Sequence, residues 1–252
     1  MSLVHVQLQG RLATVTLNDP ERRNALSADM FRALEAAFAA LQHHDASMVL
    51  HLRSNGPVFC AGFDLAACVS NRGLLASFIH RLSHLNRTIR RLRQVVVVEV
   101  QGAALAGGCA LLSACDFVCV AADATLGYPV HRIGVSPAVS LPTLLSATGG
   151  AARPLTLSAE LIDGSAALRI GLATHCAANA TDTAALAASL CDELRHKGPI
   201  ALAATKAWLN ELDGSDRDDA FDRTAENTAS LCDGDECVQM LGAFWASRRK
   251  PA

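Results

Sequence analysis

Two glycine-rich turns hold the residues whose types and spacing are best suited to chemistry. Residues 59–65 and 102–109 each follow an apolar run that predicts a buried strand. Gly107 and Gly108 also lead into a predicted helix, whose first N–H groups lack intrahelical partners and carry partial positive charge. Two such N–H groups aimed at one point would form an oxyanion hole. The alternative is that both turns are glycine-rich only because they pack tightly.

Other common catalytic motifs do not occur in this sequence. Neither turn matches GxGxxG or GxxxxGK[ST], and there is no GxSxG elbow. A phosphate-cradling nucleotide loop and an α/β-hydrolase site are therefore disfavoured. Nine cysteines are scattered without a CxxC pair, which favours reduced thiols over a zinc site.

The elements that must position the two turns follow from hydrophobic periodicity. The expected strands are 4–8 and 12–17, joined as a hairpin, then 48–52, 95–100 and 117–121. The valine-rich run 95–100 is apolar enough to be buried on both faces. The expected helices are 27–43 with Ser27 as N-cap, 75–92, 141–149, 165–170, 200–212 and 216–245. This alternation predicts an α/β fold with repeated strand–helix turns.

Composition limits the class of protein. Hydrophobic residues make up 51% of the 252 residues and charged residues 18%, so the chain can bury a large core. The formal net charge of −2 gives no reason to expect nucleic acid or an anionic membrane as a partner. No apolar run has the roughly 20 residues of a membrane span, and the N-terminal residues do not resemble a signal peptide. A cytoplasmic location is therefore expected.

One local cluster departs from the near-neutral charge. Arginines 81, 87, 90, 91 and 93 accompany apolar residues at helical spacing in the predicted helix 75–92. We interpret them as a solvated basic face, and the alternative is that they attract an anionic ligand.

Several runs, taken in order, resemble the enoyl-CoA hydratase/isomerase (crotonase) superfamily. They are residues 24–26, 59–65, 100–116, 128–137, 167–172 and 203–206, and Phe244 with Arg249, Lys250 and Pro251. The resemblance spans nearly the whole chain. It implies an α/β spiral of ββα units, with residues 1–197 as an acyl-CoA-binding core. Residues 198–252 would form a C-terminal helical arm that builds homotrimers or dimers of trimers.

The resemblance also implies a ligand and its site. A bent acyl-CoA would place its thioester oxygen between the backbone N–H groups of Phe63 and Gly107. Further substrate-binding positions carried over from the family are Arg22, Ala25, Ala61, Asp64, Leu65 and Val130. Arg22 would contact a phosphate, since a guanidinium suits that geometry. No metal ion or separate cofactor is implied, because coenzyme A is part of the substrate.

Two departures from the family pattern concern proton transfer. Hydratases of this family use two glutamates, and the matching positions here are Ala110 and Val130. A methyl and an isopropyl group cannot exchange protons, so the two-glutamate hydration mechanism cannot operate at these positions. His131 is the candidate acid or base, although on an extended segment its side chain would point away from that of Val130. Asp64, Tyr128, Cys68 and the histidines at 80 and 84 are expected to have structural or surface roles.

These observations leave more than one function open. The first hypothesis is a crotonase-superfamily lyase or isomerase that stabilises an enolate. Decarboxylation or thioester cleavage suits such a site better than hydration, because each needs fewer proton-transfer groups. The alternative is a catalytically silent acyl-CoA-binding or regulatory homologue. A third possibility is a structural partner of an active paralogue.

Overall fold

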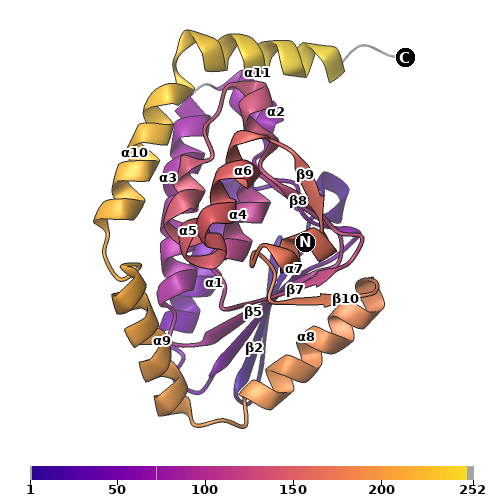
Figure 1. Cartoon of the computed structure of the whole chain (residues 1–252), viewed down its shortest axis with the longest axis vertical. Helices are drawn as coiled ribbons and strands as arrows, with labels where there is room; N and C mark the ends of the chain where they lie inside the picture. Colours follow the sequence, from indigo (N-terminus) through magenta and orange to yellow (C-terminus); the bar gives the residue numbers. More distant parts are fainter. Residues whose placement is uncertain (1, 72, 249–252) are drawn as a thin grey trace.

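Two β-sheets enclosed by helices form the chain (Figure 1). The structure is a computed structural model and describes residues 2–71 and 73–248. Arg249, Lys250 and Pro251, which contributed to the family resemblance, lie outside the described residues. Within those described residues, no helix combines the length and hydrophobicity needed to cross a bilayer.

The larger sheet has six strands in the order β1-β2-β3-β5-β7-β10. Its strands are β1 (Val4–Gln9), β2 (Leu12–Leu17), β3 (Val49–Ser54), β5 (Val95–Val100), β7 (Phe117–Ala121) and β10 (His175–Ala177). β1 and β2 form the predicted antiparallel hairpin, and every other neighbouring pair is parallel. The predicted strands of this sheet are therefore confirmed, and β10 is an additional strand.

The smaller sheet carries the two glycine-rich turns. Its four strands lie in the order β4-β6-β8-β9. They are β4 (Val58–Cys60), β6 (Ala103–Leu105), β8 (Thr125–Gly127) and β9 (Leu161–Asp163). β4 and β6 are parallel neighbours, so the turns that follow them emerge at the same edge of the sheet.

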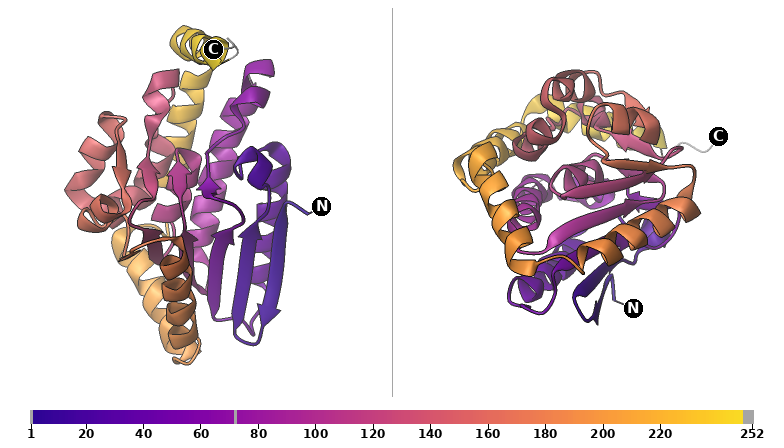
Figure 2. Two further views of the ribbon diagram at one scale, coloured as in Figure 1. Left: turned by 90° about the vertical axis from the view of Figure 1, so that its right-hand side faces the viewer. Right: turned by 60° about the horizontal axis from the view of Figure 1, so that its bottom comes forward.

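The central strand β5 is buried on both faces, as predicted. Val96, Val98 and Val100 belong to the main core, together with α1 (Ala28–Gln42) and α3 (Gly73–Arg91). Val95 and Val97 face the opposite way and pack with α8 (Ala180–Leu194). The orange ribbon of α8 lies along the large sheet in the right-hand view of Figure 2. The side chains of a strand alternate between its two faces, so only a strand covered on both sides can be apolar at nearly every position.

Helix α1 begins where the sequence predicts it. The Ser27 side chain accepts a hydrogen bond from the N–H of Met30, and one face of the helix is buried. Five shorter helices surround the small sheet and the core. They are α2 (Leu65–Ser70), α4 (Gly107–Ser113), α5 (Leu141–Thr148), α6 (Ala152–Leu157) and α7 (Gly164–Arg169).

Three helices form the C-terminal part of the chain. They are α9 (Pro199–Asp213), α10 (Asp219–Cys232) and α11 (Asp235–Arg248). In Figure 1, α9 and α10 run beside α3 along one side of the molecule, and α11 crosses its end. The prediction of one helical stretch over 216–245 was wrong. The helical conformation is interrupted at Asp233 and Gly234, between α10 and α11.

Candidate functional site

A cavity of about 520 Å³ opens beside the turns that follow β4 and β6. This volume lies within the range of roughly 300–1,000 Å³ that is typical of small-molecule sites. Of the site residues named from the sequence, Arg22, Ala25, Ala61, Phe63, Asp64, Leu65, Gly107 and Val130 line the cavity. Ala110 and His131 do not. The fold therefore gathers residues that lie more than a hundred positions apart in the sequence.

The turn after β4 is held against the turn after β6. Gly62 has φ +87°, and a Cβ atom there would lie 3.0 Å from the Leu105 carbonyl oxygen and 3.1 Å from the Ala106 Cβ. Leu26 bridges the turn, donating its N–H to the Gly62 oxygen and accepting from the N–H of Asp64. In this bridge the N–H of Phe63 is not used.

The turn after β6 contains a strained residue. Ala106 has φ 51° and ψ −115°, a conformation that costs a non-glycine residue about 1–3 kcal/mol. Its N–H donates to the Gly127 oxygen over 2.9 Å, which fixes the turn. Gly107 is then the first residue of α4. A Cβ atom on Gly108 would lie 2.3 Å from the Cys60 oxygen, so the first turn of α4 can pack on β4 only because this residue is glycine.

Two backbone donors on the cavity wall have no protein partner. Within residues 2–71 and 73–248, no group accepts a hydrogen bond from the N–H of Phe63 or of Gly107. The two residues are neighbours, because a Cβ atom on Gly107 would lie 3.2 Å from the Phe63 ring. The Gly107 donor also lies at a helix N-terminus, which favours negative charge. This part of the wall is therefore suited to an oxygen atom that gains negative charge.

The loop before α1 brings arginines to the cavity. Asn24 is fully buried and anchors the loop, because its side chain donates to the carbonyl oxygens of Asn55 and Val58. Arg22 is more than half exposed and pairs with Asp19 over 2.8 Å. Arg23 and Arg132 also line the cavity. Sequence reasoning missed these two, since nothing in their spacing distinguishes them from other surface arginines.

Of the three positions considered for proton transfer, namely Ala110, Val130 and His131, only Val130 lies on the cavity wall. Ala110 is fully buried within α4, whereas Val130 lies on the cavity wall. Residues 129–133 form a 3₁₀ helix rather than the extended segment assumed from the sequence. His131 is nevertheless turned away from the cavity, and its buried Nδ1 has no partner among the described residues.

Carboxylates are scarce on the wall. Among the described lining residues only Glu21 and Asp64 carry one. The Asp64 Oδ1 accepts a hydrogen bond from the N–H of Ala67 and so caps α2. This agrees with the structural role expected for Asp64.

Thiols close to the two turns are poor nucleophiles. Burial raises the pKa of Cys60 and of Cys109 to about 12, against weaker opposing effects of nearby hydrogen-bonding groups. Both thiols are thus protonated at neutral pH, and a thiolate is the reactive form. Cys68 is buried on α2, while the histidines at 80 and 84 are exposed on α3, as expected.

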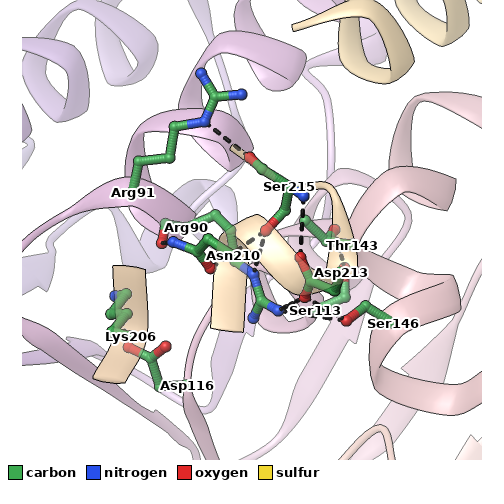
Figure 3. A network of polar contacts seen from close by, with 10 residues as sticks. All are labelled: Arg90, Arg91, Ser113, Asp116, Thr143, Ser146, Lys206, Asn210, Asp213 and Ser215. Carbon is green, nitrogen blue, oxygen red and sulfur yellow. Dashed lines mark hydrogen bonds and ion pairs between the residues drawn. The ribbon is translucent and has the colours of Figure 1, made fainter. Parts of the chain in front are cut away.

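The arginine cluster of α3 is neither a solvated face nor a ligand site. Arg90 pairs with Asp213 over 2.5 Å, and Arg91 donates to the Ser215 carbonyl oxygen over 2.8 Å (Figure 3). Arg87 pairs with Asp218 and Asp222 of the C-terminal segment. Arg81 forms a two-bond contact with Glu35 of α1. The two interpretations offered from the sequence were wrong, because these side chains tie α3 to neighbouring helices, and only Arg93 is largely exposed.

A buried lysine completes this attachment. The Lys206 ammonium lies 2.6 Å from the Asp116 carboxylate (Figure 3). It also donates to the Gln94 carbonyl oxygen. Lys206 is 5% exposed, so the pair is largely shielded from water. Removing one partner of such a pair is strongly destabilising. Lys206 therefore anchors α9 to the core.

Comparison with known families gives one match over most of the chain. The sequence model of the enoyl-CoA hydratase/isomerase family matches residues 7–251. A Thermus thermophilus protein named as an enoyl-CoA hydratase is 33% identical over 248 residues, which cover 95% of this chain and 96% of that protein. A crotonyl-CoA hydratase from Syntrophomonas wolfei is 28% identical over 227 residues, covering 88% and 86% of the two chains.

Solved structures agree with this match. The crystal structure of an enoyl-CoA hydratase from Mycobacterium avium superposes with a TM-score of 0.86 at 30% identity. The superposition covers 100% of this chain and 98% of that one. The similarity therefore includes both sheets and the C-terminal helices.

Proposed function

Since the chain belongs to the enoyl-CoA hydratase/isomerase (crotonase) family, we propose that its cavity binds an acyl-CoA thioester and polarises the thioester carbonyl. The donors are the backbone N–H groups of Phe63 and Gly107. The observation that carries the proposal is the pair of unpartnered N–H groups in adjacent turns on one cavity wall.

The chemical effect of these donors follows from where charge develops. When the thioester oxygen gains negative charge, as in an enolate, both N–H bonds strengthen. One such donor contributes roughly 3–4 kcal/mol to transition-state stabilisation. The N-terminus of α4 adds to this effect, because its partial positive charge lies at Gly107.

The arginines at the cavity would bind the phosphate groups of the coenzyme part of the ligand. Arg22, Arg23 and Arg132 line the cavity. Guanidinium groups bind phosphate oxygens in two-point contacts, and coenzyme A carries several phosphates. The proposed chemistry uses no separate cofactor, because coenzyme A belongs to the ligand.

Ordinary two-carboxylate hydration is not part of the proposal. Ala110 and Val130 occupy the positions at which the family resemblance predicts glutamates, and His131 lies off the wall. Without the two family glutamates, a water molecule cannot be both activated and protonated by the usual pair. We therefore expect chemistry that depends on enolate stabilisation and needs few proton-transfer groups.

The test removes one N–H group and keeps the rest of the site. Gly107 is the first residue of α4, a position that accepts proline in many helices, although the unusual conformation of Ala106 disfavours a following proline and makes a check of folding necessary. Gly107→Pro therefore deletes the donor, while Gly107→Ala adds a side chain and keeps it. The ligands are butyryl-CoA and its thioether analogue, in which a methylene group replaces the carbonyl.

The wild-type protein is expected to bind the thioester about tenfold more tightly than the thioether. In Gly107→Pro the two dissociation constants should converge, and in Gly107→Ala they should stay apart. Calorimetric titration measures both, with binding of free coenzyme A as the check that each variant is folded. An undiminished thioester preference in Gly107→Pro would refute the assignment.

A second candidate function is a catalytically silent acyl-CoA-binding homologue. It is favoured by Val130, which presents an isopropyl group to the cavity where a base would be needed. Acyl-CoAs that bind but yield no product by mass spectrometry would support this candidate. Turnover of any acyl-CoA that is lost in Gly107→Pro would exclude it.

A further inference from the structure

Helix α11 forms part of the cavity wall. Phe244 and Trp245, near its C-terminal end, line the cavity together with residues of the core. Figure 1 shows α11 across the end of the molecule, where it packs against α2 and the 3₁₀ helix of residues 129–133. One wall of the proposed ligand site is thus built from the last helix of the described chain.

The contacts that hold α11 on the core are apolar and limited. Among the described residues of this helix, the buried side chains are Cys237 and Leu241, which lie one turn apart. Cys237 packs closely on the loop after the 3₁₀ helix, because a Cβ atom on Gly134 would lie 2.7 Å from the Cys237 Cα. An element with few buried apolar contacts is among the parts of a protein that open most readily.

Polar side-chain contacts tie down the helices before α11 but not α11 itself. Ion pairs of Arg87 and Arg91 hold α10 against α3, and Lys206 anchors α9. Leaving Phe244 aside, no side chain of residues 235–247 forms a hydrogen bond or an ion pair with another element of the described chain. The attachment of α11 therefore differs in kind from that of α9 and α10.

The inner wall of the cavity includes an apolar stripe of α3. Leu75, Ile79 and Leu82 recur at helical spacing, line the cavity and are each at most 2% exposed. The stripe extends about 10 Å along the helix, comparable with an extended chain of about eight carbons. Aliphatic side chains offer no hydrogen bond, and they favour contact with methylene groups over contact with water. This wall therefore suits the hydrocarbon part of an acyl group.

We propose that α11 is a lid that the acyl chain of the ligand holds closed, with Trp245 in contact with that chain, so that the site selects uncharged acyl groups of about eight carbons. This inference rests on the proposed function, because the donors of Phe63 and Gly107 set where the chain begins. A chain between the α3 stripe and Trp245 covers apolar surface on both. Because a ligand stabilises the conformation that it binds more tightly, the same contacts favour binding and closure.

Cys237 reports the position of α11 without any substitution. It is 1% exposed when α11 is closed, so a thiol reagent reaches it only after the helix opens. Burial raises the pKa of Cys237, and Asp233 and Glu236 raise it further, so the covered thiol stays protonated and unreactive. Cys191 is the control, since it is fully buried in the separate core under α8.

The first experiment follows the addition of N-ethylmaleimide to each thiol of the wild-type protein by mass spectrometry. Without ligand, Cys237 should be modified faster than Cys191. Saturating octanoyl-CoA should slow the modification of Cys237 about tenfold or more, and saturating free coenzyme A should slow it less than about twofold. Cys191 should not respond to either. Equal slowing by the two ligands, or no slowing by octanoyl-CoA, would overturn the lid.

The second experiment measures dissociation constants by calorimetry for ligands of increasing chain length. From butyryl-CoA to octanoyl-CoA, each added methylene group should strengthen binding about fourfold, as expected for its burial. Adipoyl-CoA has the chain length of hexanoyl-CoA but ends in a carboxylate. It should bind about tenfold more weakly than hexanoyl-CoA or worse, because the carboxylate would lose its hydration against an apolar wall.

A variant pair tests the contact of Trp245 with the chain. Trp245→Ala should weaken octanoyl-CoA binding about tenfold and leave the constant of free coenzyme A within about twofold. In this variant octanoyl-CoA should no longer protect Cys237. Leu231→Ala is the matched control, since Leu231 is a large apolar residue of α10 that is 54% exposed and lines no part of the cavity. Equal weakening in both variants, or none in Trp245→Ala, would overturn the role of Trp245.

The outcomes also distinguish this inference from the proposed function. Affinity that does not change with chain length, with the thioester preference over a thioether intact, overturns this inference alone. Tighter binding of adipoyl-CoA than of hexanoyl-CoA overturns the uncharged class. Failure of every acyl-CoA to bind more tightly than free coenzyme A would overturn the proposed function itself.

Discussion

The groups left for chemistry on the cavity wall are mostly backbone atoms. Phe63 and Gly107 are named for their N–H groups. The Phe63 ring packs against Phe31 and Phe78, and the absence of a side chain at Gly107 leaves room for that ring. A conventional side-chain substitution at these positions would therefore change packing more than chemistry. Val130 is the exception, because its side chain lies on the wall and can be replaced directly.

Replacing Val130 by glutamate should introduce the missing base. In Val130→Glu a carboxylate would stand on the wall near the polarised thioester and could remove the α-proton. We expect exchange of the α-hydrogens of butyryl-CoA with deuterated water to rise at least tenfold over wild type, since a positioned base contributes about 10²–10⁴-fold. Proton NMR measures this rate.

Val130→Gln is the control for this substitution. It has nearly the same shape as glutamate but cannot take up a proton at neutral pH, so exchange should stay at the wild-type rate. Equally fast exchange in wild type and Val130→Glu would show that another group already serves as the base.

At the residue scale, sequence reasoning succeeded where a motif fixes the backbone and could not reach features that depend on the surrounding fold. The oxyanion candidates depend on glycines in turns after strands, and that pattern is visible in the sequence. The orientation of His131 depends on whether residues 129–133 are extended or helical, which neighbouring side chains cannot decide. The place of Trp245 on the cavity wall is invisible in the sequence, because it depends on how α11 packs across the end of the molecule.

At the scale of elements, α3 holds the C-terminal helices through charged groups. Burial alone would raise the pKa of Asp213, but hydrogen bonds from Ser215, Ser146 and Arg90 outweigh it, and the pKa lies below the usual 3.8. A carboxylate with a lowered pKa stabilises the folded state above the unfolded pKa. That stabilisation is lost as the pH falls through the folded pKa.

The attachment of this segment should therefore weaken in acid. At pH 6, Asp213→Asn is expected to lower the free energy of unfolding by about 1 kcal/mol, a modest value because the pair is partly exposed. The difference from wild type should shrink as the pH falls below about 3.8, since Asp213 is then protonated in wild type as well. Thermal unfolding followed by circular dichroism between pH 6 and pH 2.5 measures this.

Asp216→Asn is the matched control, because Asp216 is an exposed carboxylate of the same segment. It should change stability little at any pH. If the effect of Asp213→Asn were the same at pH 3 as at pH 6, the carboxylate would not be the stabilising group.

Elements with strong local signals were predicted correctly. In α1 the Ser27 cap and the apolar face both favour a helix. In β5 the β-branched residues and the continuous apolar run both favour a buried strand. Strands β4, β6, β8, β9 and β10 were missed because each has three residues, too few to show a period. Arg87, Arg90 and Arg91 of α3 were misinterpreted because their partners lie on segments more than a hundred residues away.

At the scale of the whole molecule, α9 presents two different sides. Lys206 and Asn210 are buried against the core. Trp208, Leu209 and Leu212 face away from them, and 63% of Trp208 and 86% of Leu212 are exposed. Clustered apolar side chains of this size on a surface commonly mark an interaction site. The family resemblance predicts that the C-terminal helices build homotrimers or dimers of trimers, and we propose that this face contributes to that contact.

The proposal predicts that charge on α9 disrupts self-association without unfolding the chain. Wild type should elute as a trimer or hexamer in size-exclusion chromatography with light scattering, and Trp208→Glu/Leu212→Glu should shift toward the monomer. The reason is that each glutamate would have to be buried without a partner, at a cost of several kcal/mol. Leu8→Glu is the control, since Leu8 is also about half exposed but lies on β1. A monomeric wild type, or a double variant that assembles as well as Leu8→Glu, would show that this face of α9 is not the contact.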